Sequence, residues 1–209
     1  RIERQVTSLN EVQQLFLTKL TQRYTEKTAA SKAYAQDNRR WMADPRAVTG
    51  FKPVTKELVY PIVVERSKGS RLWDIDGNGY IDGLNGFGST LFGYQTNLLK
   101  TVLHDQIERG YELGPQHKLA GQVTRMVCEF TGFDRAALCN TGSEAVLGAL
   151  RMARTVTGRS LVVTFAGSYH GIFDEVISRG STSHQSYPAA LGIPSEAVQN
   201  VLILDYGTD

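Results

Sequence analysis

The sequence predicts an α/β fold with three layers, in which helices cover both faces of a mostly parallel sheet. From residue 135 onward, short apolar segments alternate with segments of helical periodicity, as in parallel strands joined by crossover helices. An amphipathic helical segment and a β-hairpin pattern precede this region. The 209 residues are enough for one good-sized domain, with no internal repeat and no low-complexity tract.

Composition narrows the class of protein. A hydrophobic share of 41% and a charged share of 21% are typical of a soluble globular protein. The net charge of +2 and the lack of Lys/Arg runs give no reason to expect nucleic acid or an anionic membrane as partner. No apolar run is long enough to span a bilayer, and there is no signal peptide. Cys128 and Cys139 lack CxxC spacing, so we expect reduced core thiols in a cytoplasmic protein.

The first half of the chain changes from helical to β character. Residues 1–56 form a leader with one amphipathic helix, and its polar stretch can continue this helix to Arg40. A strand is expected over 59–64. A hairpin is expected over 71–82, with its positive-φ turn at 76–79. A Gly-rich loop over 83–93 follows. The domain proper is therefore expected to cover residues 57–209.

The remaining elements follow from apolar spacing and from glycines at helix ends. They are a helix around 99–107 ended by Gly110, a helix around 119–130 ended by Gly132, a strand over 135–140, a helix over 143–157 ended by Gly158, a strand over 160–165, a shorter segment near 171–177, a polar loop, and a strand over 200–204.

A turn of small residues at 140–143 joins an expected strand to an expected helix. Thr141 and Glu144 have the spacing of a capping box. The helix start would direct unpaired N–H groups to one spot, Gly142 would allow close approach, and the hydroxyls of Thr141 and Ser143 would add donors. Two interpretations remain open here: a phosphate site, or a well-capped helix that binds nothing. The turn by itself favours the second.

A second loop, at 167–171, follows the strand expected over 160–165. In parallel sheets, ligands collect beyond the carboxyl ends of the strands, so Tyr169 and His170 are expected near the first turn. A phosphate seat beside an aromatic ring suits a phosphorylated planar cofactor. His170 alone would be interpreted as a loop hydrogen-bonding residue. No histidine has a partner at metal-ligand spacing, and neither the Walker nor the dinucleotide glycine motif is present.

Taken together, these motifs resemble the class III aminotransferases, a pyridoxal-phosphate (PLP) family of fold type I that includes glutamate-1-semialdehyde aminomutase. The resemblance covers about residues 57 to 209. The matching segments are LWDIDGNGYID at 72–82, FGY at 92–94, NTGSEA at 140–145 and SYHG at 168–171, in the family's order.

The resemblance implies roles for particular residues. Thr141, Gly142 and Ser143 would hold the phosphate of PLP, Tyr169 would stack on the pyridine ring, and His170 would support the surroundings of the ring. Ser89 and Thr90 lie in a loop similar to the one that lines the substrate entrance near the dimer interface, which implies a homodimer in the full-length domain.

The leader and the sequence FGSTLFGY at 87–94 resemble more closely the aminotransferase domains of hybrid polyketide/non-ribosomal peptide synthases, of the microcystin/nodularin synthetase type. This resemblance implies amination of a β-keto acyl chain on an acyl carrier protein, with an amino-acid donor. The leader would then be the linker from the upstream carrier.

The resemblance also implies two groups that this chain lacks, a Schiff-base lysine and the acid that binds the pyridine nitrogen. The last lysine is Lys118, before the phosphate turn, so no catalytic residue is named. The chain begins at Arg1 rather than Met and ends just after an expected strand, so we expect the N-terminal part of a domain with an incomplete sheet, inactive alone. A free-standing glutamate-1-semialdehyde aminomutase and a non-catalytic dimerisation element of the same fold remain alternatives. A nicotinamide-binding domain is disfavoured by the missing glycine motif.

Overall fold

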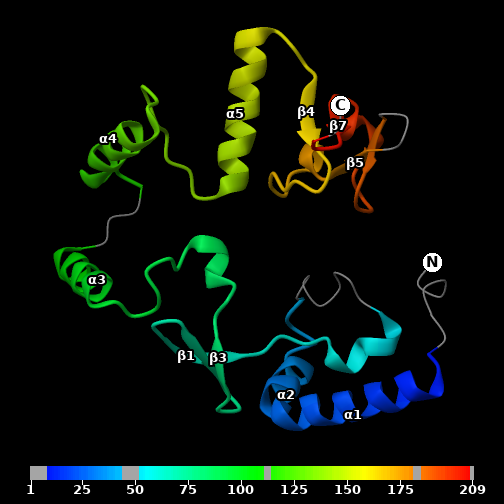
Figure 1. The fold of residues 1–209 in the computed structure, drawn as a ribbon. Helices are drawn as coiled ribbons and strands as arrows, with labels where there is room; N and C mark the ends of the chain where they lie inside the picture. The colour runs from blue at the N-terminus through cyan, green and yellow to red at the C-terminus, as the bar shows by residue number, and fades with distance from the viewer. Residues whose placement is uncertain (1–8, 44–51, 111–113, 181–184, 208–209) are drawn as a thin grey trace. The chain divides into compact units, whose positions relative to one another are not determined.

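The computed structural model describes residues 9–43, 52–110, 114–180 and 185–207. The chain divides into two compact units, Arg1–Tyr111 and Glu112–Asp209. Figure 1 shows helices and a small sheet in the first unit, and helices with short strands in the second. Each unit is described by itself below.

Two helices open the first unit, where the sequence predicted one continuous amphipathic helix. Helix α1 (Glu11–Lys27) begins at Asn10, which forms a capping box with Gln13, and helix α2 (Ala29–Asp37) follows after a break at Thr28. Thr28 is buried, and its hydroxyl lies 2.7 Å from both the carbonyl oxygen of Tyr24 and the hydroxyl of Tyr60. The break therefore has a tertiary cause that neither glycine nor proline signals in the sequence.

A three-stranded antiparallel sheet follows, with the order β1 (Val64–Lys68), β2 (Arg71–Asp74) and β3 (Gly79–Ile81). The predicted hairpin over 71–82 is confirmed. The predicted strand over 59–64 is wrong except for Val64. Pro61 has no N–H for a ladder, and the N–H of Val63 donates to Ser31 Oγ at 3.2 Å. The N–H of Val63 is therefore taken by helix α2, while its carbonyl oxygen accepts from Ile75 N, just after β2, at 2.9 Å.

Two aspartates make the hairpin turn rigid and join it to helix α2. Asp74 is almost fully buried, and its carboxylate accepts hydrogen bonds from Asp76 N, Asn78 N, Asn78 Nδ2 and Tyr80 Oη at 2.7 to 3.1 Å. The carboxylate of Asp76 then accepts from Ala30 N at 2.6 Å, Ser31 N at 3.0 Å and Ser31 Oγ at 2.9 Å. Asp76 thus caps the start of α2 from a distant part of the chain.

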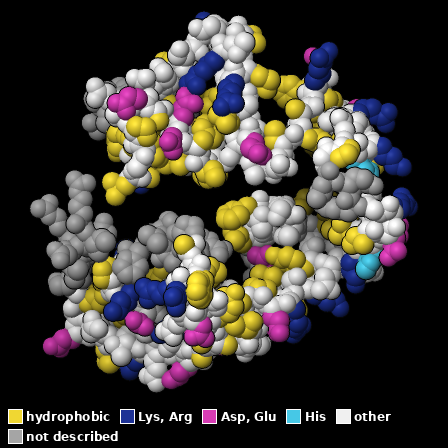
Figure 2. All heavy atoms as spheres, turned by 180° about the vertical axis from the view of Figure 1, so that it is seen from behind, with side chains coloured by type: hydrophobic (Ala, Val, Ile, Leu, Met, Phe, Trp, Pro, Cys, Tyr) yellow, Lys and Arg dark blue, Asp and Glu magenta, His cyan; other side chains and the backbone are white. Residues whose placement is uncertain are grey.

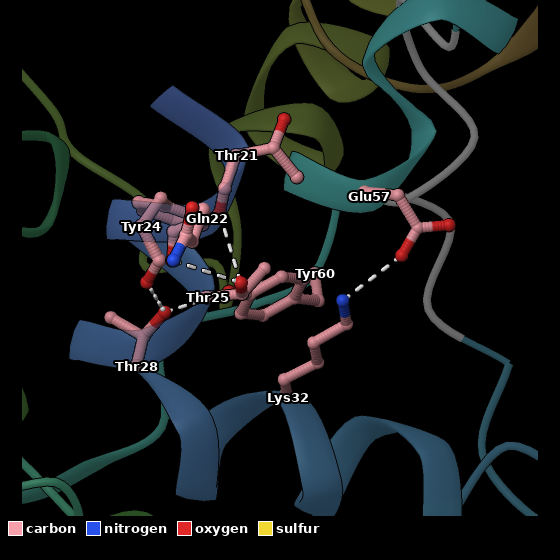
Figure 3. A network of polar contacts seen from close by, with 8 residues as sticks. All are labelled: Thr21, Gln22, Tyr24, Thr25, Thr28, Lys32, Glu57 and Tyr60. Atoms are coloured by element: carbon pink, nitrogen blue, oxygen red, sulfur yellow. Dashed lines mark hydrogen bonds and ion pairs between the residues drawn. The ribbon is translucent and has the colours of Figure 1, made fainter. Parts of the chain in front are cut away.

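The leader also contacts the short 3₁₀ helix η3 (Pro53–Leu58) and the residues after it. Figure 3 shows Tyr60 beside the α1–α2 junction and Lys32 of α2 reaching Glu57, with Lys32 Nζ 2.9 Å from Glu57 Oε2. Asn78 Nδ2 donates to Lys27 O at 2.7 Å. The described part of the leader is therefore packed on the hairpin. The division into residues 1–56 and 57–209 stays a prediction.

The Gly-rich loop closes on itself before the next helix. It contains the short helix η4 (Asn85–Gly88), and Tyr94 Oη donates to Asp82 Oδ2 at 2.6 Å. The tyrosine hydrogen bond lowers the pKa of Asp82. Helix α3 (Asn97–Arg109) begins at the cap residue Thr96, and it ends before Gly110, as the sequence predicted.

The second unit contains helices α4 (Leu119–Thr131) and α5 (Gly142–Thr157), both close to the predicted bounds. Strands β4 (Val162–Phe165) and β7 (Val201–Leu204) pair in parallel, which confirms two predicted strands and the direction of their pairing. Between them lie η5 (Asp174–Val176), β5 (Ser178–Gly180), β6 (Ser186–Pro188) and η6 (Ser195–Val198).

Two predictions for this unit are wrong. Residues 135–140 form no strand, because they have no ladder partner among the described residues. The segment predicted as a polar loop contains the antiparallel pair β5–β6, whose three-residue strands are too short to show a β period.

Many large apolar side chains are exposed on the described helices, for example Phe130 of α4, and Figure 2 shows hydrophobic groups across the visible surface. None of the described helices has the length and apolar character to cross a membrane.

We predict that Asp76→Ala lowers the free energy of unfolding of the chain by about 1 to 2 kcal/mol, because the start of α2 loses the carboxylate that caps it. Denaturant unfolding measures this change. Asp105→Ala on the exposed face of α3 is the matched control, because no hydrogen bond of Asp105 is found among the described residues. Equal losses in the two variants would contradict the capping role of Asp76.

We predict an acid-sensitive contribution from Asp74. Burial alone would raise the pKa of this carboxyl, but the hydrogen bonds from Tyr80, Asn78 and Asp76 outweigh it and hold the pKa below its ordinary value of 3.8. The stabilisation is therefore present above 3.8 and is lost as the pH falls through the lower folded-state pKa.

Unfolding free energies measured from neutral pH into this acid range test the prediction. Asp74→Asn should be less stable at neutral pH and should lose less stability on acidification than the wild type. Asp105→Asn should keep the wild-type acid dependence. The same acid slope in wild type and Asp74→Asn would contradict the prediction.

Candidate functional site

The start of helix α5 carries the predicted turn. Thr141 is the cap residue in an extended conformation, with φ −135° and ψ 155°. Thr141 Oγ1 accepts from Glu144 N at 3.2 Å, and Glu144 Oε2 accepts from Thr141 N at 2.8 Å. The predicted capping box is therefore confirmed. The hydroxyl of Thr141 also donates to Glu144 Oε2 at 3.2 Å, so this turn already uses it.

The capping box leaves two N–H groups of the first helical turn available. Among the described residues, no hydrogen bond uses Gly142 N or Ser143 N. A Cβ atom added at Gly142 would meet nothing within 4 Å, so the space beside this residue is open. Together with the partial positive charge of the helix start, two free donors in open space form a seat that fits a phosphate group.

A second loop lies directly against this turn. Gly171 is buried and has φ +126°, and a Cβ atom placed on it would lie 2.9 Å from Ser143 Oγ and 3.2 Å from Ser143 Cα. The next residue, Ile172, donates its N–H to Ser143 Oγ at 3.2 Å. The structure thus brings together the turn at 140–143 and the loop at 167–171, although the segment before the first of them is not a strand.

Tyr169 and His170 lie just before this contact. The side chain of Tyr169 is exposed, so its ring face is accessible. His170 Nε2 is buried and finds no hydrogen-bond partner among the described residues. A cavity of about 290 Å³ adjoins the loop and extends to β5 and β6, with Ser168, His170, Ser178, Arg179 and Tyr187 among its lining residues.

Helix α5 is also held at its far end. Arg154 donates from Nε to Ser160 O at 2.9 Å and from Nη2 to Glu175 Oε1 at 2.5 Å. The hydrogen bond with Glu175 raises the pKa of Arg154. Residues 143 to 154 span about 16 Å of helix, so the segment that follows the Tyr169 loop contacts α5 at two separated points. This anchoring orients the helix start relative to the loop.

Ser89 and Thr90, the predicted substrate residues, lie in the first unit, while the predicted cofactor residues lie in the second. Ser89 Oγ donates to Gly86 O at 2.8 Å, and Thr90 Oγ1 donates to Asn85 Oδ1 at 2.7 Å. Phe87 has φ +55°, which is uncommon for a residue with a side chain. In this loop both hydroxyls stabilise the local turn, and their role towards substrate stays a prediction.

The described residues contain no group of three or more His, Cys, Asp or Glu side chains that could hold a metal ion. Both cysteines are free thiols, with Cys139 exposed.

Sequence reasoning did not identify Ile172 as part of the site, because its contribution is a backbone N–H whose partner lies 29 residues away. The only sequence signal at this position was the glycine that precedes it.

Known proteins are similar to this chain in sequence and in fold. The family described as "Aminotransferase class-III" matches residues 53–206. A glutamate-1-semialdehyde 2,1-aminomutase from Archaeoglobus fulgidus is 36% identical over 159 residues, which cover 74% of this chain and 36% of that protein. The chain therefore spans little more than a third of the length of this curated relative.

Solved structures have the same fold. A β-phenylalanine aminotransferase from Variovorax paradoxus aligns with a TM-score of 0.71 at 26% identity, covering 91% of this chain and 41% of that one. A glutamate-1-semialdehyde aminomutase from Pseudomonas aeruginosa aligns with a TM-score of 0.76 at 22% identity, covering 94% of this chain and 44% of that one. The predicted fold type I architecture is confirmed. Because the family match covers most of the sequence, the chain belongs to the class III aminotransferases.

Proposed function

We propose that this chain is the N-terminal part of a PLP-dependent aminotransferase domain. The observation that carries the proposal is the open, amide-lined start of α5 with the Tyr169 loop packed against it. PLP is the cofactor of the class III family, to which the chain belongs. Two similar solved structures support this cofactor: a transaminase with PLP bound, and a lysine-to-alanine aminomutase variant from Pseudomonas aeruginosa in complex with PMP, the amine form of PLP.

Different residues of the site are proposed to bind different parts of PLP. The N–H groups of Gly142 and Ser143 donate to the phosphate, and the hydroxyl of Ser143 adds a further donor. The exposed ring of Tyr169 would cover one face of the pyridine ring, and His170 would support the surroundings of the ring. Thr141 contributes by shaping the turn, because its hydroxyl bonds to Glu144. When bound, PLP supplies the electron sink for amino-group transfer.

The proton-transfer machinery lies outside this chain. No lysine follows Lys118, so no residue beyond the phosphate turn can bond covalently to the cofactor. The length of the curated relative, of which the chain covers 36%, supports the interpretation that the remaining groups belong to a longer protein. The chain alone therefore binds and orients without catalysing transfer.

The finer proposal concerns substrate and partners. The leader and the segment FGSTLFGY at 87–94 support an aminotransferase module of a hybrid polyketide/non-ribosomal peptide synthase. Such a module takes a β-keto acyl chain from an acyl carrier protein and an amino group from an amino acid, works as a homodimer, and is cytoplasmic. Ser89 and Thr90 are proposed to line the substrate entrance.

A free-standing glutamate-1-semialdehyde aminomutase is the second candidate, because the relative with 36% identity has this activity in its name. A carrier-protein sequence before Arg1 would favour the synthase module over the aminomutase. A parent protein with no lysine after residue 209 would instead favour a non-catalytic dimerisation element.

Reconstitution of the parent domain tests the proposed function. The domain is loaded with PLP, and amination of a β-keto acyl carrier protein is measured with an amino donor, while isomerisation of glutamate-1-semialdehyde is measured separately without one. The synthase module should aminate only the carrier-bound chain. Conversion of glutamate-1-semialdehyde alone would establish the second candidate, and no PLP absorbance on the purified domain would contradict both.

We predict that Gly142→Asp abolishes retention of PLP in the parent domain, because a carboxylate would occupy the phosphate seat and repel the dianion. The variant should fold, since a side chain at Gly142 meets nothing within 4 Å and an acidic residue suits a helix start. Ala149→Asp, which adds the same charge at an exposed position of α5, is the control and should retain PLP. Equal PLP occupancy in both purified variants would refute the phosphate assignment.

A further inference from the structure

A side chain at position 171 would crowd Ser143. A Cβ atom there would lie 3.2 Å from both Cα and Cβ of Ser143, and these atoms belong to the first turn of α5, which cannot move aside easily. The backbone of Gly171 also has φ +126°, a conformation that residues with side chains rarely adopt. Both properties favour glycine, and the close approach is the one that depends on helix α5.

The hydroxyl of Ser143 provides the second half of this contact. Its oxygen accepts the N–H of Ile172 at 3.2 Å, which leaves the hydroxyl hydrogen free to donate elsewhere. The hydroxyl of Thr141, in contrast, is already committed to Glu144. Ser143 can therefore hold the loop and donate into the open seat at the same time.

These two contacts limit how far Tyr169 can lie from the phosphate seat. Tyr169 precedes Gly171 by two residues, and two fully extended residues span at most about 7 Å. The phosphate of PLP is joined to its ring by one short ester arm, so the sites for the ring and the phosphate must be neighbours. A loop that moved away from α5 would separate them.

We propose that Gly171 and the N–H of Ile172 are positioning residues that hold the Tyr169 loop against the first turn of α5. We call this pair of contacts the loop lock. It holds the site for the pyridine ring next to the site for the phosphate before the cofactor binds. Binding of the cofactor therefore carries no cost for ordering the loop. This inference rests on the proposed function, because it assumes that Tyr169 covers the pyridine ring.

The first test measures the lock without any cofactor. Hydrogen exchange of the 209-residue chain should show the amide of Ile172 protected, and Ser143→Ala should speed its exchange by about tenfold or more through loss of the acceptor. The amide of Ala166, which donates to Leu204 O at 2.8 Å, reports whether β4–β7 remains folded. Unprotected Ile172 in the wild type, with Ala166 protected, would overturn the lock.

The second test separates positioning from folding by comparing two probes. PMP carries ring and phosphate and needs no lysine for attachment, whereas inorganic phosphate probes the seat alone. Gly171→Ala should weaken PMP binding about tenfold, equivalent to about 1.4 kcal/mol, with phosphate affinity nearly unchanged. Gly148→Ala, inside α5 with open space around it, is the control and should bind both probes as the wild type does.

Each outcome distinguishes the lock from the proposed function. Equal weakening of PMP and phosphate by Gly171→Ala would overturn the lock in favour of a general loss of the turn. Wild-type binding of phosphate at the seat with no preference for PMP would overturn the role of Tyr169 and the lock together. Binding of neither probe would refute the phosphate seat of the proposed function, and the exchange of the Ile172 amide would still decide whether the contacts of the lock exist.

Discussion

The N–H groups at the start of helix α5 are the constraint on which the site depends. An α-helix cannot satisfy its first N–H groups internally. Here the capping box satisfies Glu144 N and Thr141 N, and the N–H groups of Gly142 and Ser143 remain without a partner among the described residues. The same two residues lie in open space and next to the Tyr169 loop. The local cap thus selects which donors are left for a ligand.

The start of α2 shows the opposite use of the same constraint. There the carboxylate of Asp76 reaches Ala30 N and Ser31 N from the hairpin turn, and the helix start is closed by the protein's own negative charge. No described side chain outside the capping box occupies the start of α5 in this way. A helix start closed by a distant aspartate has a structural role, whereas a capped but open one has room for an anion. The open start of α5 therefore supports the proposed phosphate site at the turn at 140–143.

How much the sequence could predict depends on how local each signal is. Caps and terminal glycines gave α3, α4 and α5 correctly, because Gly110, Gly132 and Gly158 act within one turn of their helices. The failures involve distant partners. An apolar run such as 135–140 predicts an extended chain but not a neighbour to pair with, and the break at Thr28 depends on Tyr60, 32 residues away. In the site, the residue types were predictable from the motifs, whereas the contact of Ile172 with Ser143 was not.

The two units also separate the tasks of the proposed enzyme. The second unit holds the residues proposed for the phosphate and the ring, and these include backbone donors, an aromatic face and a close glycine contact. The first unit holds the proposed substrate residues, and the last lysine of the chain precedes both loops of the site. Under the proposed function, recognition of the cofactor rests on the geometry of these residues, whereas the covalent step needs a lysine, and no lysine follows Lys118 in this chain.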